Sequence, residues 1–256
     1  MVEPLLRIEN LVRRFGGIVA TDNLSLDIAQ GELHAIIGPN GAGKTTLISQ
    51  LIGQLRPSAG TIRFAGQDVT HLPAWKRSHL GLARSFQITS LLPNFTAAEN
   101  VALAAQARDG HSFRFFGNAR KEKGLRATAH SALERVGLAG RADVVVSQLS
   151  HGEQRELELA VALASRPKLL LLDEPMAGLG ATESARMVKL LADLRNEVTI
   201  VLVEHDMNAV FALADRITVL VYGRVIASDV PAAIRSNEEV KRAYLGDQHV
   251  VTSHGG

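Results

Sequence analysis

Gly38-Pro39-Asn40-Gly41-Ala42-Gly43-Lys44-Thr45-Thr46 is the stretch that decides the fold of this chain of 256 residues. It follows the apolar run 33–37, which reads as a strand, and precedes the helix-forming residues 47–55. The pattern is G-x-x-x-x-G-K-T between a strand and a helix, the setting that a phosphate-binding loop requires. Glycine lets the backbone curl and aim successive N–H groups at a phosphate, and the helix N-terminus adds a positive dipole end. We therefore predict nucleotide contacts from residues 38–46, against the alternative of an accidental glycine-rich turn.

Charged and polar side chains in the loop and after a later apolar run supply the chemistry of hydrolysis. Lys44 brings a positive charge to the β- and γ-phosphate oxygens, and the Thr45 hydroxyl is a ligand for Mg²⁺. Four leucines, 169–172, lead to Asp173 and Glu174, at the strand end where open α/β sheets bind ligands. We expect Asp173 to hold Mg²⁺ through its waters and Glu174 to act as general base on the attacking water. The alternative for this pair is a solvated strand end.

A histidine marks the end of another apolar run. Residues 199–203 lead into Glu204-His205-Asp206, so His205 should reach the same edge of the sheet. A single histidine is more often structural than catalytic, but its place at the end of a parallel strand favours a functional role.

Alternating apolar runs and helical patterns predict an α/β fold with a mainly parallel sheet. Residues 182–195 place apolar side chains at helical spacing between two runs, and residues 61–69 resemble an antiparallel hairpin at the edge. Residues 88–162 contain helical candidates at 96–107 and 120–136 and no convincing strand. The apolar runs taken as strands are 24–28, 33–37, 168–172, 199–203, 217–222 and 224–227.

These patterns divide the chain into a core, a helical segment and a tail. We expect the core at residues 1–87 and 163–229, a helical subdomain at 88–162, and a C-terminal helix with a frayed tail at 230–256. A basic insertion, 107–126, interleaves Lys and Arg with phenylalanines. It reads either as a solvated excursion or as a contact with a membrane surface or a partner.

Composition excludes several classes of protein. There is no cysteine, which excludes disulfide scaffolds, thiol nucleophiles and Cys-based metal sites. Lys and Arg (28) nearly balance Asp and Glu (26), so nucleic-acid binding is not expected. The longest uncharged stretch, 85–98, is interrupted by polar residues and Pro, so we expect no bilayer span and no secretion signal.

The segment Leu149-Ser150-His151-Gly152-Glu153-Gln154 narrows the function further. Ser150 and Glu153 form an S-x-x-E capping box that opens a helix over 153–164, but a capping box does not explain Gly152. Together with the loop and the strand ends, this segment resembles the signature of the ATP-binding-cassette ATPases, whose common form is LSGGQ. The resemblance covers residues 5–245.

The resemblance implies a P-loop NTPase fold of the ABC type: a RecA-like core, an antiparallel N-terminal β subdomain and an inserted helical subdomain, with ATP and Mg²⁺ as cofactors. It implies that Phe15 stacks on adenine, against a core-packing alternative, and that Gln87 joins the core to the helical subdomain and senses Mg²⁺ and the γ-phosphate. Ser150 and Gly152, with Glu153 in the signature's glutamine position, match residues that contact the γ-phosphate held by a second copy. His205 matches the histidine that touches the same phosphate.

Three positions depart from the family pattern. His151 replaces the first glycine of the signature, Glu153 replaces its glutamine, and Gly180 stands where most relatives have an aspartate. Because Ser150 and Gly152 remain, we expect hydrolysis to survive, whereas communication across the dimer through that aspartate is in question.

Further sequence segments resemble the ATPase subunits of bacterial branched-chain amino acid importers, and the related transporters of urea and other amides are similar as well. They are residues 84–91, 149–157, 173–179, 203–206 and 243–246. The resemblance implies a homodimer or a heterodimer with a paralogous ATPase, permease subunits gripped by the helical insertion, and an indirect link to a periplasmic solute-binding protein. The chain would be cytoplasmic and peripheral on the inner face of the inner membrane.

Two other functions are weighed against this one. A soluble cassette protein acting on ribosomes or DNA commonly has paired cassettes, long coiled coils or a basic face, none of which this sequence shows. A nucleotide-binding regulator without turnover is opposed by the presence of both Glu174 and His205.

Overall fold

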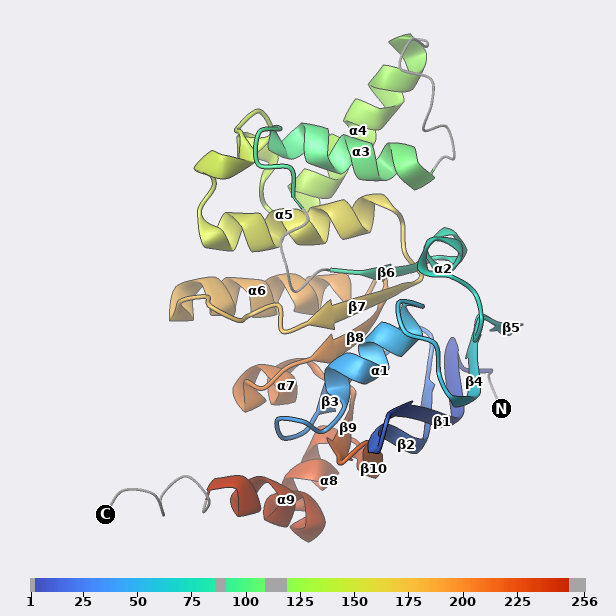
Figure 1. Cartoon of the computed structure of the whole chain (residues 1–256). Coiled ribbons are helices and arrows are strands. Elements are labelled where there is room, and N and C mark those ends of the chain that lie inside the picture. Colours follow the sequence, from blue (N-terminus) through green and yellow to red (C-terminus); the bar gives the residue numbers. More distant parts are fainter. Residues whose placement is uncertain (1–2, 86–90, 109–118, 249–256) are drawn as a thin grey trace.

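A six-stranded sheet carries the glycine-rich loop, in the order β10-β9-β3-β8-β7-β6 (Figure 1). The computed structural model describes residues 3–85, 91–108 and 119–248. Within the sheet, β6, β7, β8, β3 and β9 run parallel, and β10 pairs antiparallel with β9 at the edge. The strands are β3 (Leu33–Ile37), β6 (Leu82–Arg84), β7 (Leu169–Asp173), β8 (Thr199–Val203), β9 (Arg216–Val221) and β10 (Arg224–Asp229).

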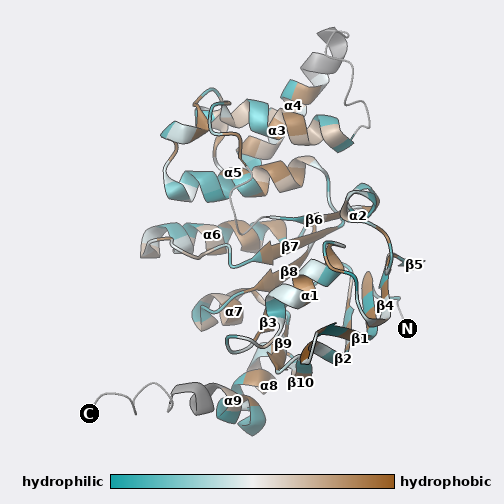
Figure 2. Cartoon of the chain, in the orientation of Figure 1, coloured by the Kyte–Doolittle hydropathy of each residue, from teal (hydrophilic) through white to brown (hydrophobic). Residues whose placement is uncertain are grey.

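The central strands are buried on both faces, as their uninterrupted apolar runs predict. Every residue of β3, β7 and β8 is buried. Alternate side chains enter two different cores: Leu170 and Leu172 pack toward one layer of helices, and Leu169 and Leu171 toward the opposite layer. Figure 2 shows these strands as the most hydrophobic part of the ribbon.

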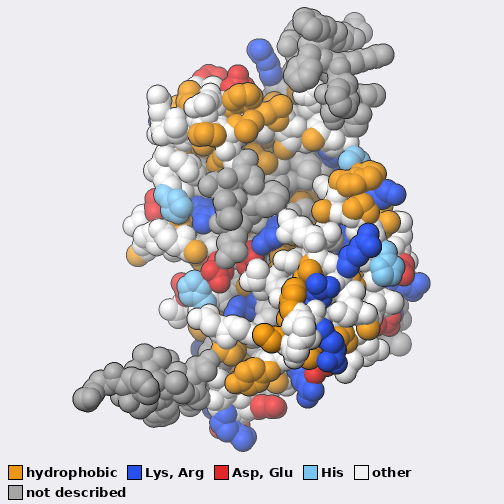
Figure 3. Space-filling view, in the orientation of Figure 1, with side chains coloured by type: hydrophobic (Ala, Val, Ile, Leu, Met, Phe, Trp, Pro, Cys, Tyr) orange, Lys and Arg blue, Asp and Glu red, His pale blue; other side chains and the backbone are white. Residues whose placement is uncertain are grey.

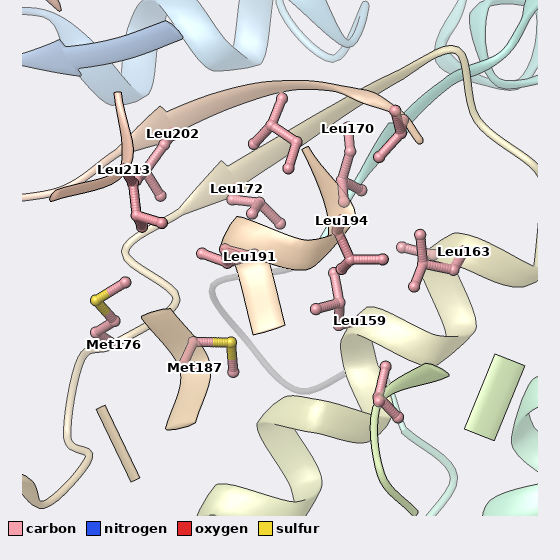
Figure 4. Packing of buried hydrophobic residues seen from close by; sticks show 14 of the residues in the cluster. Leu159, Leu163, Leu170, Leu172, Met176, Met187, Leu191, Leu194, Leu202 and Leu213 are labelled. Atoms are coloured by element: carbon pink, nitrogen blue, oxygen red, sulfur yellow. The ribbon is translucent and has the colours of Figure 1, made fainter. Parts of the chain in front are cut away.

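Helices cover the first face of this sheet. Leu191 and Leu194 of α6 (Ala181–Leu194) meet Leu170 and Leu172, while leucines of α5 (His151–Ala164) close the far side of the same cluster (Figure 4). The predicted helical stripe of α6 is confirmed, since Met187, Leu191 and Leu194 are its buried residues. The remaining helices on this side include α7 (Met207–Leu213), α8 (Pro231–Ser236) and α9 (Glu238–Gln248).

The opposite face is covered by α1 (Lys44–Leu51) and a second sheet, ordered β2-β1-β4-β5 and antiparallel throughout. The predicted hairpin is confirmed as β4 and β5, joined by Ala65 and Gly66, both at positive φ. Residues 24–28 lie in this sheet rather than in the parallel one, with alternating burial because only one face meets the core. The strands are β1 (Leu6–Phe15), β2 (Ile18–Ile28), β4 (Ala59–Phe64) and β5 (Gln67–Asp68).

Residues described between 91 and 162 form helices and 3₁₀ turns, with one isolated bridge between Thr96 and Val145. The predicted helices appear as α3 (Ala97–Arg108) and α4 (Ala119–Arg135), which gather with α5 at one end of the molecule (Figure 1). A further helix, α2 (Ala74–Leu80), leads into β6. The expected fold class is thus confirmed, while the domain boundaries remain a prediction. Part of the basic insertion, 109–118, lies outside the described residues.

No helix in the described ranges is both long and apolar enough to cross a bilayer.

Candidate functional site: a nucleotide site at the strand ends

Strand register brings the candidate residues to one edge of the sheet. Ile36 pairs with Val203 across β3 and β8, and Asp173 pairs with Val203 across β7 and β8. The glycine-rich loop, Glu174 and the segment after Val203 therefore leave three adjacent strands at their carboxyl ends. This is the edge at which parallel α/β sheets bind ligands.

The β3–α1 loop is already curled in the form that a phosphate would need. The Ala42 N–H donates to the Pro39 carbonyl at 3.1 Å, and Gly43 begins α1 in a left-handed conformation, φ +100°. No side chain caps α1, so the first N–H groups of this helix are directed at the loop. The loop and helix together form a cradle for an anion.

Close packing explains two of the glycines. A Cβ at Gly38 would lie 2.2 Å from the Leu220 carbonyl oxygen, and one at Gly43 would lie 2.3 Å from the Ala20 carbonyl oxygen. Neither backbone oxygen can move without shifting a strand. Glycine is required at these positions by the walls behind the loop, in addition to the space needed for a phosphate.

Lys44 lies in the mouth of the loop. Its Nζ donates to the carbonyl oxygens of Gly38 at 2.6 Å and Pro39 at 3.0 Å. Burial lowers the pKa of the Lys44 ammonium, while the nearby carboxylates of Glu174 and Asp173 act in the opposite direction. The Lys44 ammonium therefore stands where phosphate oxygens would approach. A bound phosphate would replace the two carbonyl oxygens as its hydrogen-bond acceptors.

A distant hairpin braces the loop from behind. The N–H of Gly223, between β9 and β10, donates to the Ala42 carbonyl at 2.9 Å, and the Gly223 carbonyl accepts from the N–H of Asp22 at 2.9 Å. Arg224 also pairs with the Asp22 carboxylate. Sequence reasoning missed this brace because Asp22 and Arg224 are 202 residues apart along the chain.

Asp173 ends β7 as a buried carboxylate, 3% exposed. Its Oδ2 accepts a hydrogen bond from Arg84 Nη2 at 2.8 Å. Thr45, by contrast, is exposed at the start of α1. The register of the strands thus directs a carboxylate toward the edge at which α1 presents a hydroxyl.

Glu174 and His205 come together beside this carboxylate. His205 Nδ1 lies 4.0 Å from Glu174 Oε1, with side chains 67% and 33% exposed. Glu174 has a positive φ of 50°, and its N–H donates to the Val203 carbonyl at 2.8 Å, so the chain turns sharply directly after β7. An unusual backbone conformation is found more often at functional sites than elsewhere.

Glu204 is a residue that sequence reasoning did not assign. Its buried carboxylate accepts N–H groups from Met176 at 3.0 Å and His205 at 2.9 Å, with a longer contact from Asp206. It therefore joins the turn after Glu174 to the loop that carries His205. Only the position of Glu204 between an apolar strand and a histidine could have indicated this role.

The donor set fits a Mg²⁺–nucleotide complex better than a metal held by protein alone. The described residues contain no group of three or more His, Asp or Glu side chains that could hold a metal ion. Mg²⁺ is usually bound by one or two protein oxygens together with phosphates and water. Thr45 and Asp173 would supply those protein oxygens.

The signature segment stands apart from the loop. Ser150 caps α5: its Oγ accepts the Glu153 N–H at 3.2 Å, and the Glu153 carboxylate accepts the Ser150 N–H at 2.8 Å. That N–H bond, with Arg141, lowers the pKa of Glu153. A Cβ at Gly152 would lie 2.5 Å from Glu183 Oε1, so Gly152 also fits against α6. In Figure 1, α6, β7 and β8 separate α5 from the β3–α1 loop.

The last two predicted residues have different outcomes. Phe15, at the end of β1, is 47% exposed, which excludes the core-packing alternative, and the Arg13 guanidinium lies 4.6 Å from its ring centroid. Gln87 lies outside the described residues.

Comparison with known proteins agrees with this geometry. Residues 21–177 match the family described as ABC transporter, and residues 224–250 match a branched-chain amino acid ATP-binding cassette transporter region. The chain is 39% identical to the high-affinity branched-chain amino acid transport ATP-binding protein LivG of Salmonella typhimurium, covering 96% of this chain and 100% of that protein. It is 38% identical to BraF of Pseudomonas aeruginosa, with the same coverage.

Solved structures give the same result. The ADP conformation of MJ1267, an ATP-binding cassette of an ABC transporter, superimposes with a TM-score of 0.83 at 27% identity, over 96% of this chain and 100% of that one. A dimeric post-hydrolysis structure of the cassette MJ0796, bound to ADP and Pi, gives a TM-score of 0.75 at 27% identity, over 88% of this chain and 98% of that one. The chain belongs to the ABC transporter family, in which it is an ATP-binding cassette that hydrolyses ATP.

Proposed function

We propose that this cassette powers the import of branched-chain amino acids or related small solutes through separate permease subunits. The observation that carries the ATP-driven part of the proposal is the meeting of Lys44, Asp173, Glu174 and His205 at one edge of the parallel sheet. The substrate class follows the names of LivG and BraF, which describe branched-chain amino acid transport. This chain itself would not touch the solute.

In the proposed reaction each residue has a separate task. Lys44 leaves the Gly38 and Pro39 carbonyls and binds β- and γ-phosphate oxygens, and the N–H groups of α1 bind the same phosphates. Glu174 takes a proton from the attacking water, and His205, 4.0 Å from that carboxylate, helps to orient the water and the γ-phosphate.

Bound Mg²⁺, held by the Thr45 hydroxyl and by Asp173 through water, would neutralise charge on the phosphates. Phe15 would stack on adenine and Gln87 would sense the γ-phosphate. Both assignments come from the family resemblance.

A second copy would complete each site. The α5 N-terminus, with Ser150 and Gly152, stands away from the loop of its own chain. The capping box satisfies the N–H groups of Ser150 and Glu153, so the positive end of the helix dipole and the N–H groups between them are what α5 would offer to the nucleotide of a second copy. Arg141 pairs with the extra carboxylate of Glu153, which reduces its repulsion of a phosphate. The cassette MJ0796 has been solved as a dimer bound to ADP and Pi, which supports a dimeric state for this chain. The partner is this chain or a paralogous ATPase.

A groove beside the helical segment suits a permease loop. It has a volume of about 490 Å³ and lies between α2 with β6 on one side and α3 with α5 on the other. Apolar side chains are exposed along it, including Trp75 (62%) and Leu103 (40%). Figure 3 shows hydrophobic side chains over both α2 and α3. A permease docked here would keep the cassette on the inner face of the membrane, with a solute-binding protein involved only indirectly.

Uptake of radiolabelled leucine by cells tests this function. Deleting the gene should abolish high-affinity uptake, and the wild-type chain should restore it while Glu174→Gln should not. Unchanged uptake of leucine, isoleucine, valine and small amides in the deletion strain would refute the proposed import role.

A further inference from the structure

A buried ion pair links the proposed Mg²⁺ ligand to the neighbouring strand. Arg84 ends β6, and its Nη2 donates to Asp173 Oδ2 at 2.8 Å, with side chains 10% and 1% exposed. Arg84 pairs in register with Leu171, so Asp173 projects two residues farther along β7, on the face that carries α1. Asp173 therefore already has a cation beside it.

The hydrogen bonds of Arg84 differ from those of an arginine with a purely structural task. Arg77 is 1% exposed and donates to four backbone carbonyls, which fixes the segment around α2. Arg84 bonds Asp173 and, at 3.3 Å, Gln54 Oε1, while its Nε is buried with no hydrogen-bond partner among the described residues. Its strongest interaction is with the carboxylate, and it fixes no backbone segment.

The charge of Arg84 affects both the stability of the Asp173 carboxylate and the approach of a divalent cation. A buried carboxylate without a counter-charge is costly, so Arg84 stabilises Asp173 when no nucleotide is bound. The guanidinium also repels any divalent cation that approaches the same carboxylate. A triphosphate brings negative charge that offsets this repulsion.

We propose that Arg84 is a positioning residue that neutralises Asp173 in the empty cassette and thereby makes divalent-cation binding depend on the nucleotide. The inference rests on the proposed role of Asp173 as a Mg²⁺ ligand. Arg84 and Gln54 also line the groove, so a segment docked there would contact the side chain that holds the carboxylate.

The test measures binding, without turnover. Affinity for ATP is determined calorimetrically with EDTA and with saturating Mg²⁺, in the wild type, Arg84→Met and Arg84→Lys. Without Mg²⁺, Arg84→Met should bind ATP more weakly because a positive charge is lost. With Mg²⁺ the loss of ATP affinity should be smaller, because the cation is no longer repelled by the Arg84 guanidinium. The ratio of the ATP affinity with Mg²⁺ to the ATP affinity with EDTA should rise at least about tenfold in Arg84→Met. In Arg84→Lys this ratio should stay close to that of the wild type.

A control removes another ion pair at the opposite end of the parallel strands. Arg195 pairs with Asp215 at 3.0 Å, with both side chains 38% exposed, where Asp215 accepts the N–H of Leu33 at the start of β3, so Arg195→Met should leave the ratio unchanged. An unchanged ratio in folded Arg84→Met, or an equal change in Arg195→Met, overturns the proposal. No ATP binding by the wild type would instead overturn the proposed function.

A second measurement follows the divalent cation in the absence of nucleotide. Mn²⁺ binding to the nucleotide-free protein, followed by electron paramagnetic resonance, should be undetectable at micromolar concentrations in the wild type and should become detectable in Arg84→Met. Micromolar binding of Mn²⁺ to the nucleotide-free protein, lost in Asp173→Asn, would refute the idea that Arg84 keeps the site free of cations.

Discussion

Replacing Gly43 by alanine tests whether the walls behind the phosphate loop set its shape. The added Cβ would lie 2.3 Å from the Ala20 carbonyl oxygen and 3.5 Å from the Gly223 Cα. The first distance is more than an ångström too short, so either the loop or β2 has to move. The residue must also keep φ near +100°, a conformation that residues with a Cβ disfavour.

The size of the effect follows from these two contributions. A left-handed conformation costs a non-glycine residue about 1–2 kcal/mol. Forcing an extra methyl group into a packed site costs about 1–3 kcal/mol. We therefore expect Gly43→Ala to lower the free energy of unfolding by about 2–5 kcal/mol. A loop displaced by about 1 Å should also lose catalysis on the order of 100-fold.

Gly41 supplies the matched control. It has φ +80°, but a Cβ there would meet no atom within 4 Å. Gly41→Ala should therefore show only the conformational cost, about 1–2 kcal/mol. Urea unfolding of the nucleotide-free proteins measures both values. If the two variants lose equal stability, the contact with Ala20 does not shape the loop and the reasoning fails.

Three further changes test other parts of the account. Glu174→Gln should bind ATP with wild-type affinity and hydrolyse it at least about 100-fold more slowly in a phosphate-release assay, and near-normal turnover would remove this residue from the role of base. Because burial lowers the pKa of Lys44, its ammonium is lost at a lower pH than that of an exposed lysine, so ATP affinity measured by calorimetry should fall as the pH rises through the alkaline range; the same slope in Lys44→Met would assign it to another group. Leu191→Ala, in the core under β7, should cost about 2–5 kcal/mol in urea unfolding, more than the partly buried Leu190→Ala, and equal losses would contradict the packing.

Local patterns in the sequence were sufficient for the central strands and the catalytic edge. The predicted bounds 33–37 and 199–203 coincide with β3 and β8, because apolar runs between turn signals end where the strands end. Parallel pairing then brings Lys44, Asp173 and His205 to one edge. The capping box at Ser150 and Glu153 was also visible, since its contacts lie within four residues.

Contacts between distant segments could not be predicted in this way. The brace of Gly223 and Asp22 behind the loop, the pair of Arg84 with Asp173, and the carboxylate of Glu204 all depend on tertiary contacts. β6 was missed because three residues are too short for an alternating pattern. β1 was missed because charged residues interrupt its apolar positions.

Mixing two inactive variants tests most directly whether ATP is enclosed between two copies. Lys44→Ala removes the cradle charge and Ser150→Arg blocks the α5 N-terminus, so each variant alone should hydrolyse almost no ATP. In a mixed dimer, one site would pair an intact loop with an intact α5. We predict that an equimolar mixture recovers up to about a quarter of the wild-type rate, because half of the dimers are mixed and each has one complete site. A mixture as inactive as its folded components would contradict the composite site.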